Sequence, residues 1–187
     1  MKVPSLVAML LGVVLTCAPQ VARAQDQGKT AAAELTSASK AALAELVAST
    51  PLAKTLVPGA AAILVFPKVT KAGLGIGGQY GEGTLLKKGT AAAFYKTTGA
   101  SFGLQAGGQQ YGYAMFFMNA KAVTQLDNAK GFEVGIGPTV VVVDEGMAKT
   151  TTTSTLKDDI YAFVFSQKGL MAGIGLQGNK ISKITPK

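Results

Sequence analysis

Glycine alternates with bulky apolar residues in three segments of this chain, and no other feature limits the possible folds as strongly. The segments cover residues 73–77, 101–107 and 169–176. A period of two places the bulky side chains on one face of a strand and the glycines on the other. Because glycine weakens a strand, its repeated use indicates that another backbone or a helix approaches the glycine face closely.

Helical patterns precede this glycine-rich region and recur once within it. Apolar residues follow helical spacing over residues 30–49, and this helix should end at Thr50, which comes before a proline. A shorter helix is predicted over residues 52–56. A third helix is predicted over residues 119–128, with Asn119 as its N-cap.

Short apolar or β-branched runs predict the other strands. They cover residues 61–66, 111–118, 140–143, 150–155 and 161–165, and we expect Pro67 to end the first of them. The aromatic and methionine run at 111–118 favours a core position over a lipid-facing patch. Together the elements predict an α+β fold, with N-terminal helices packed on a Gly-rich, mainly antiparallel twisted sheet that forms a sandwich or a partial barrel.

The first 24 residues have the pattern of a secretory signal peptide. A positive charge at Lys2 precedes a short apolar run, and Ala22-Arg23-Ala24 follows as a small-x-small cleavage site. Cleavage after Ala24 would leave residues 25–187 as a single domain of ordinary size. In an alternative interpretation Cys17 is lipidated and the protein is a lipoprotein. Both interpretations imply export, so we expect a periplasmic or secreted protein that is peripheral to a membrane.

Two missing residue types restrict the chemistry of the chain. It contains no histidine, and Cys17 is its only cysteine. Because Cys17 lies in the predicted signal peptide, the mature chain should form no Ser-His or Cys-His nucleophilic site, no thiolate zinc site and no imidazole metal site. Glu82, which lies between two glycines, is the one acid that could orient a ligand, although a solvated turn is the simpler interpretation. We predict that the protein is not an enzyme and has no metal or cofactor.

Two motif matches have structural explanations that fit the sequence better than a functional one. Residues 73–78 match the dinucleotide fingerprint G-x-G-x-x-G, but Gly81 and Gly83 would weaken the helix that this site requires. Residues 37–40 match S-x-x-K of penicillin-recognising enzymes, but the companion motifs are missing. We interpret the first match as a tight strand and the second as helix surface, and we predict no nucleotide binding.

The charge of the chain is basic, with a formal net charge of +8. Such an excess favours anionic partners, namely phospholipid headgroups, lipopolysaccharide or nucleic acid. Nucleic acid is the least expected of these partners for an exported protein, so we predict no nucleic-acid binding. The alternative is that the positive charge only keeps the domain soluble.

Several long blocks of the sequence resemble the SYLF family. They cover residues 65–83, 100–107, 162–172 and 180–184. This resemblance implies a membrane-lipid-binding module, because eukaryotic members bind phosphoinositides and some also engage actin, while bacterial members are exported. In eukaryotic members an N-terminal amphipathic helix contributes to lipid binding. Here the helix at 30–49 lacks the basic polar face of a membrane-binding helix, so we expect it to pack on the sheet.

The resemblance and the charge together predict an exported module that binds anionic phospholipid or phosphoinositide-like headgroups. The candidate contacts are Lys68 and Lys71, beside the first glycine-rich strand, and Lys87 and Lys88, at a predicted hairpin tip. Each lysine near an anionic surface contributes about 1 kcal/mol, so binding would be reversible and salt-sensitive. Ordinary solvated turns are the alternative for these lysines. The alternative function is a structural or stress-related cell-envelope protein that acts through protein–protein contacts.

Overall fold

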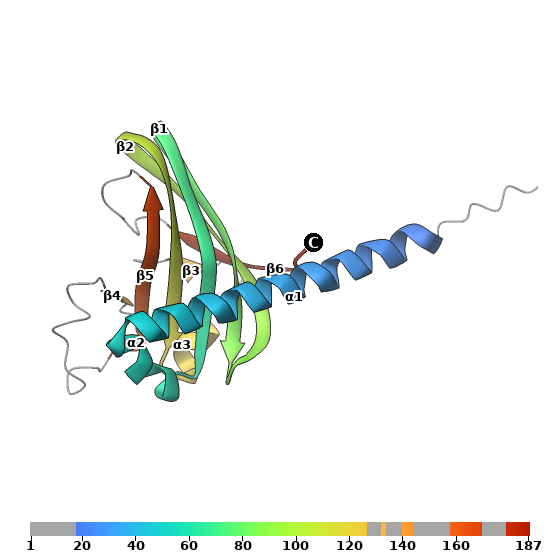
Figure 1. The fold of residues 1–187 in the computed structure, drawn as a ribbon, viewed down its shortest axis with the longest axis horizontal. Coiled ribbons are helices and arrows are strands. Elements are labelled where there is room, and N and C mark those ends of the chain that lie inside the picture. Colours follow the sequence, from blue (N-terminus) through green and yellow to red (C-terminus); the bar gives the residue numbers. More distant parts are fainter. Residues whose placement is uncertain (1–17, 127–131, 134–139, 144–157, 170–178) are drawn as a thin grey trace, which may run out of the picture.

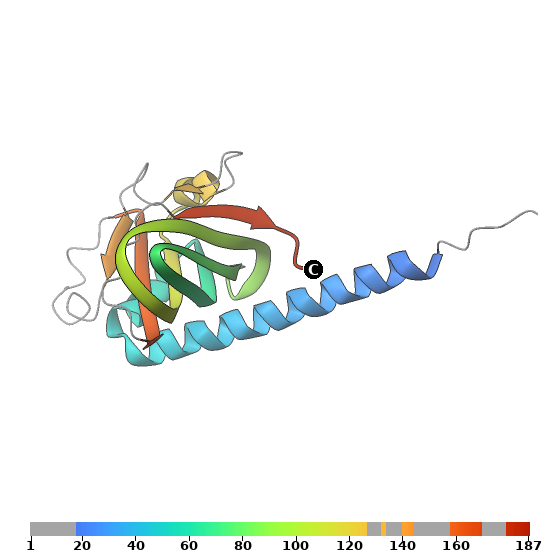
Figure 2. The ribbon, with the colours of Figure 1, turned by 90° about the horizontal axis from the view of Figure 1, so that it is seen from above.

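The computed structural model describes residues 18–126, 132–133, 140–143, 158–169 and 179–187. These residues form a strongly curved sheet, with α1 and α2 on one side and α3 on the other (Figures 1 and 2). The helical elements are α1 (Ala18–Ser49), α2 (Pro51–Leu56), the 3-10 turn η1 (Val57–Gly59) and α3 (Ala120–Leu126). The strands are β1 (Ala62–Lys87), β2 (Thr90–Phe117), β3 (Phe132–Glu133), β4 (Val140–Val143), β5 (Ile160–Gly169) and β6 (Lys180–Ile184).

The six described strands form one sheet in which β2 is the central member. The strand order is β3-β6-β2-β5-β4, and β1 also pairs with β2. All pairings are antiparallel except that of β4 with β5, which is parallel. The predicted α+β fold with a mainly antiparallel sheet is therefore confirmed. Its predicted strand at 150–155 lies outside the described residues, as does most of the third glycine-rich segment, since residues 170–178 are not described.

A single long hairpin of β1 and β2 dominates the sheet. The two strands pair from Ala62 with Phe117 as far as Lys87 with Thr90, so their register spans the whole of β1. The φ angle is 48° at Lys88 and 76° at Gly89, as in the two-residue turn of type I′ that matches the twist of paired strands. The predicted hairpin tip at these lysines is confirmed.

Both strands of the hairpin are bent over near their middle, and glycine makes the bend possible. A Cβ atom added at Gly73 would lie 2.4 Å from the Cα of Gly77, so the chain turns sharply between them. Beyond the bend, Gly81 approaches the Lys68 carbonyl and Gly83 approaches the Val65 carbonyl. Figure 2 shows the two strands curling over in this way. The expected close approach of another backbone is confirmed at Gly73, and Gly81 and Gly83, outside the predicted segments, are approached by the same strand as well.

Pro67 does not end the first strand, contrary to the prediction. The strand β1 continues through it to Lys87, and the register with β2 shifts between Phe66 and Val69. Proline cannot donate a ladder hydrogen bond, and a bulge is one of the places where a strand tolerates it. The sequence pattern correctly located an irregularity but wrongly identified it as an end.

The helix α1 begins at Ala18, earlier than the predicted residue 30, and ends at Ser49 as predicted. The run of alanine and glutamine ahead of residue 30 has a high helix propensity, which accounts for the longer helix. Its carboxyl-terminal half crosses the sheet over β1, while its amino-terminal end extends beyond the sheet (Figures 1 and 2). Ala42 and Leu46 are buried against the sheet, so the expected packing role of this helix is confirmed.

Two hydrophobic clusters lie on the two faces of the curved sheet. One fills the concave side, includes Phe66, Leu85 and Tyr113, and is covered by α3, while the other lies under α1 and α2 and includes Leu46 and Phe116. The residues of the run 111–117 are all buried, and they alternate between the two clusters. The prediction that this aromatic run is core is confirmed.

The helix α3 is capped as predicted, and residues 127 and 128 of the predicted helix lie outside the described residues. The Asn119 side-chain oxygen Oδ1 accepts a hydrogen bond of 2.9 Å from the Ala122 backbone N–H. The Asn119 amide also donates a hydrogen bond of 2.5 Å to Asp159, so the cap connects α3 to the start of β5. The predicted strands at 140–143 and 161–165 are present as β4 and within β5.

Candidate functional site

The outer face of the hairpin bend exposes large apolar side chains. Leu74 is 83% exposed and Ile76 is 69% exposed, whereas the aromatic and branched residues of the two cores are almost fully covered. Both residues lie on the face of β1 that points away from its own second half, because Thr70 and Ala72 on that face are exposed as well. We refer to Leu74, Ile76 and the exposed residues Lys68, Thr70 and Ala72 as the outer bend face.

The four lysines predicted as lipid contacts do not lie together. Lys68 is exposed on the outer bend face, but Lys71 is buried, with only 3% of its surface exposed. Lys87 and Lys88 are exposed at the hairpin turn, which lies at the opposite end of the sheet from the bend (Figure 1). A surface role therefore suits Lys68, Lys87 and Lys88, while Lys71 faces the interior because strand residues alternate between faces.

The fold adds a lysine to this surface that the sequence pattern did not indicate. Lys168 on β5 is exposed and pairs with Gln110 on β2, which in turn pairs with Thr70 on β1. Neighbouring strands lie about 4.8 Å apart, so Lys168 lies about 10 Å from the outer bend face. Lys68 and Lys168 are far apart in the sequence, so only the strand order of the sheet brings these two lysines into one region.

Glu82 is engaged with a neighbouring side chain on the surface of the second half of β1. Its carboxylate accepts a hydrogen bond from the Tyr80 hydroxyl, and Tyr80 is half exposed. This hydrogen bond, together with burial and the negative charge of Glu82, raises the pKa of Tyr80 above its usual value. The pair is a local surface contact within β1, where Glu82 pairs across the strands with Lys96, so the turn expected at Glu82 is wrong.

A group of polar side chains is buried on the concave side of the hairpin. Lys71 pairs across the strands with buried Gln109, and the Tyr111 hydroxyl donates a hydrogen bond of 3.1 Å to Gln79 Oε1. Burial raises the pKa of Tyr111 to about 12. Burial and the nearby Tyr111 also raise the pKa of Tyr113, so both phenols remain protonated hydrogen-bond donors at neutral pH. Sequence reasoning missed this group because its members lie far apart along the chain.

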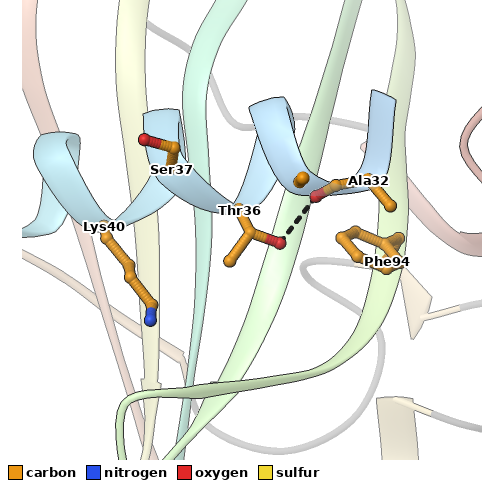
Figure 3. A pocket seen from close by; sticks show the side chains of 6 residues that line it. Ala32, Thr36, Ser37, Lys40 and Phe94 are labelled. Atoms are coloured by element: carbon orange, nitrogen blue, oxygen red, sulfur yellow. Dashed lines mark hydrogen bonds between the residues drawn. The ribbon is translucent and has the colours of Figure 1, made fainter. Parts of the chain in front are cut away.

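A shallow groove separates α1 from the β2 residue Phe94 (Figure 3). Its α1 side is lined by Ala32, Ala33, Thr36, Ser37 and Lys40. The Thr36 hydroxyl already donates a hydrogen bond of 2.7 Å to the Ala32 carbonyl of its own helix, so it could meet a ligand only as an acceptor. Ser37 and Lys40 are exposed on the helix surface, as the interpretation of the S-x-x-K match predicted.

The other motif matches also have structural roles. Residues 73–78 lie within β1, and no helix begins there, so the arrangement that a dinucleotide needs is absent from this described segment. Within the described residues, no group of three histidine, cysteine, aspartate or glutamate side chains could hold a metal ion. None of the described helices combines the length and the hydropathy needed to cross a membrane.

The fold and the surface define an α+β domain built on one long, bent β-hairpin that carries an exposed apolar end. Residues 98–185, from the middle of β2 to the end of the sheet, match the family model Ysc84, described as "Las17-binding protein actin regulator". The predicted SYLF resemblance is thus confirmed over residues 98–185, which are similar to the Ysc84 (SYLF) family. No curated protein matches the chain.

Proposed function

We propose that this protein is an exported, non-catalytic module that binds anionic lipid headgroups at a membrane surface. The observation that carries the proposal is the exposure of Leu74 and Ile76 on the outer bend face, on the same side of the hairpin as Lys68. Similarity to the Ysc84 (SYLF) family supports a lipid-binding or actin-regulator-like domain. The signal-peptide pattern of the first 24 residues supports export, and therefore a lipid partner rather than actin.

The outer bend face combines the two contributions that bring a peripheral protein to a bilayer. Complete burial of a leucine or isoleucine side chain stabilises by about 1.5 to 3 kcal/mol, so Leu74 and Ile76 together could contribute about 3 to 6 kcal/mol. Each lysine near an anionic surface adds about 1 kcal/mol, which falls with salt. Lys68 lies six residues before Leu74, about 20 Å along the strand. Both residues can therefore contact the membrane only if the outer bend face lies flat on its surface.

Vesicle co-sedimentation tests the proposal. The full chain is mixed with vesicles of phosphatidylcholine alone, or with anionic phosphatidylglycerol added, at low and high salt. We expect binding to the anionic vesicles that weakens at high salt. The double variant Leu74→Ser/Ile76→Ser should lose most of this binding, and Lys68→Gln/Lys168→Gln should lose its salt-dependent part.

Two further double variants locate the contact. Lys87→Gln/Lys88→Gln removes the lysines at the opposite end of the sheet, and Lys54→Gln/Lys121→Gln removes the same charge from exposed positions on α2 and α3. We expect both to bind as the unmodified protein does. If Lys87→Gln/Lys88→Gln binds weakly while the Leu74/Ile76 variant binds normally, the membrane contact is at the hairpin turn and the assignment to the outer bend face is wrong. If the unmodified protein does not bind anionic vesicles at low salt, the lipid-binding proposal is refuted, and pull-down of a defined envelope partner would then favour the protein–protein function.

A further inference from the structure

The groove between α1 and the sheet lies where this helix is incompletely packed. In the carboxyl-terminal half of α1, Ala42 and Leu46 are buried on the sheet. Before Ser39 the residues on the side towards the sheet are only partly covered, and most of them are small. They are Gly28, Ala31, Ala32, Leu35 and Thr36. Side chains of this size leave a space of about 470 Å³ beside Phe94, which we call the α1 groove.

Two contacts hold α1 in place, one beyond each end of the groove. At one end the buried Ser39 hydroxyl donates a hydrogen bond of 3.1 Å to Thr84, the cross-strand partner of Phe94. At the other end the buried Pro186 lies against α1, since a Cβ atom at Gly28 would be 3.2 Å from its carbonyl oxygen. The helix between these contacts is about 16 Å long. Because it is fixed at both ends, the groove is already formed before any ligand arrives.

The wall of the groove is apolar, and its rim carries a positive charge. Phe94, Ala32 and Ala33 supply the apolar surface. Lys40 also lines the groove, and Figure 3 shows its side chain and that of Thr36 projecting from α1 on the side of Phe94. No acid is among the described residues that line the groove. The groove therefore offers an apolar surface that ends at a cation.

The position of a second lysine extends this pattern along the helix. One row of α1 consists of Lys29, Ala33, Thr36 and Lys40, at spacings of four, three and four residues. Residues at these spacings are neighbours on one side of a helix. Three of the four line the groove, so the row runs along it and Lys29 lies towards its amino-terminal end. The groove is thus flanked by a lysine in each direction.

The acids of the same helical segment lie on the other side of α1. Glu34 and Glu45 are the only acids between residues 27 and 49, and neither lines the groove. The Glu45 carboxylate accepts a hydrogen bond of 2.6 Å from the Ser166 hydroxyl of β5. The charges of this segment are therefore separated, with the lysines on the groove side. An anion near the groove would be attracted without repulsion from a neighbouring carboxylate.

The dimensions of the groove restrict its occupant to a narrow molecule. Between Ala32 and Lys40 the helix is about 12 Å long, and small-molecule sites have volumes of about 300 to 1,000 Å³. A stable protein partner would bury about 800 Å² on each side, far more than six lining residues supply. An acyl chain is narrow and apolar, and an anionic head at its end would complement Lys40.

We infer that the α1 groove binds the acyl chain of a single-chain anionic amphiphile of the fatty-acid type, with its head at Lys40. The chain lies on Phe94 and the two alanines, where its methylene groups leave water. The Lys40 ammonium pairs with the anionic head in a charge-assisted hydrogen bond. The groove takes single molecules rather than a bilayer, and it shares no residue with the outer bend face. The inference therefore does not depend on the proposed function.

NMR titration of the full chain with decanoate, below its micelle concentration, tests the inference. We expect saturable shifts of the Ala32 and Ala33 methyl signals, and nuclear Overhauser effects between the Phe94 ring and the decanoate methylene groups. Affinity should rise from octanoate to decanoate by up to about fourfold for each methylene added, and acetate should cause no shifts. Absence of the Phe94 effects, or an affinity independent of chain length, would overturn the inference.

A pair of substitutions locates the acyl chain. Ala33→Leu places a larger side chain in the groove from an exposed position, so it leaves the core intact. We expect it to weaken decanoate binding at least about tenfold, because the added side chain occupies part of the space. Ala38→Leu makes the same change at an exposed alanine of α1 that does not line the groove, and should bind as the unmodified protein does. Equal affinities of the two variants would refute the site.

A second pair of measurements identifies the contact of the anionic head. Lys40→Gln should bind decanoate severalfold more weakly but bind decanol, which has no charge, as the unmodified protein does. Lys54→Gln, on α2, should change neither affinity. Unchanged decanoate binding by Lys40→Gln, or an equal loss with decanol, would refute the role of this lysine. The Leu74→Ser/Ile76→Ser variant should bind decanoate normally even where it has lost vesicle binding, so the two proposals can fail separately.

Discussion

Because β1 folds back onto itself, we predict that a side chain added at Gly83 destabilises the protein. An alanine Cβ at this position would lie 2.4 Å from the Val65 carbonyl oxygen and 2.6 Å from Cδ1 of Phe66. Real Cβ atoms do not approach other heavy atoms so closely, and the nearest obstacle is backbone rather than a flexible side chain. This clash can be relieved only if the two halves of β1 separate, in a region where Phe66 is completely buried. Gly83→Ala should therefore destabilise the protein strongly.

The size of the effect follows from these contacts and from a matched control. Overpacking a core by extra methylene groups typically costs about 1 to 3 kcal/mol, and a clash with backbone belongs at or above the upper end of that range. Gly78→Ala changes the same strand in the same way, but its Cβ would have only the Gly99 carbonyl, at 3.8 Å, as a neighbour. The control should be neutral, or more stable by about 0.4 to 1 kcal/mol, because alanine restricts the unfolded chain.

Urea unfolding followed by circular dichroism measures both variants. In a domain of this size, a decrease of about 3 kcal/mol in the free energy of unfolding lowers the melting temperature by about 6 to 12 °C. The urea midpoint of Gly83→Ala should fall well below that of Gly78→Ala. Equal midpoints for the two variants would show that the two halves of β1 do not pack on each other, and the bent-hairpin description would be refuted.

Three further predictions concern the connections between elements. Ser39→Ala removes the buried hydroxyl of α1 that bonds to the Val65 carbonyl and the Thr84 hydroxyl, and the free energy of unfolding in urea should fall by about 1 to 2 kcal/mol. Asn119→Ala removes the N-cap of α3 and its hydrogen bond to β5, and should destabilise by about 1 kcal/mol in the same assay. Because the pKa of Tyr111 is raised to about 12 by burial, its contribution to stability is complete below about pH 10 and is lost as the pH rises towards 12. Tyr111→Phe should therefore lose less stability than the unmodified protein between pH 9 and pH 11, and an equal loss would contradict this cause.

The bent hairpin also explains how one chain can present an apolar end and a polar interior. The outer bend face keeps Leu74 and Ile76 in solvent because the second half of β1 packs on the opposite face. The same packing encloses Lys71 and Gln109 on the concave side. The family match begins within β2 and does not cover Leu74 or Ile76, so the assignment of the membrane contact to the outer bend face rests on the geometry of β1.

Local patterns were sufficient for most elements of the fold. The glycine alternation predicted strands with a closely approached face, and the helical spacing correctly predicted the end of α1 at Ser49. The cap at Asn119 and the hairpin turn at Lys88 and Gly89 were also predictable, because each depends on residues within a few positions of one another. The end assigned at Pro67 was wrong, since a proline marks both strand ends and bulges, and only pairing across the sheet distinguishes them.

The sequence by itself determined the residue types available to this protein, and so its chemistry: no histidine, one cysteine, excess lysine and repeated glycine. Only the tertiary structure decided where those residues act. Lys68 and Lys71 are three positions apart, yet one is exposed and the other is buried, because the bulge at Pro67 and the alternation of the strand place them on opposite faces. Lys71 and Gln109 become neighbours through strand pairing, a contact that no local pattern contains.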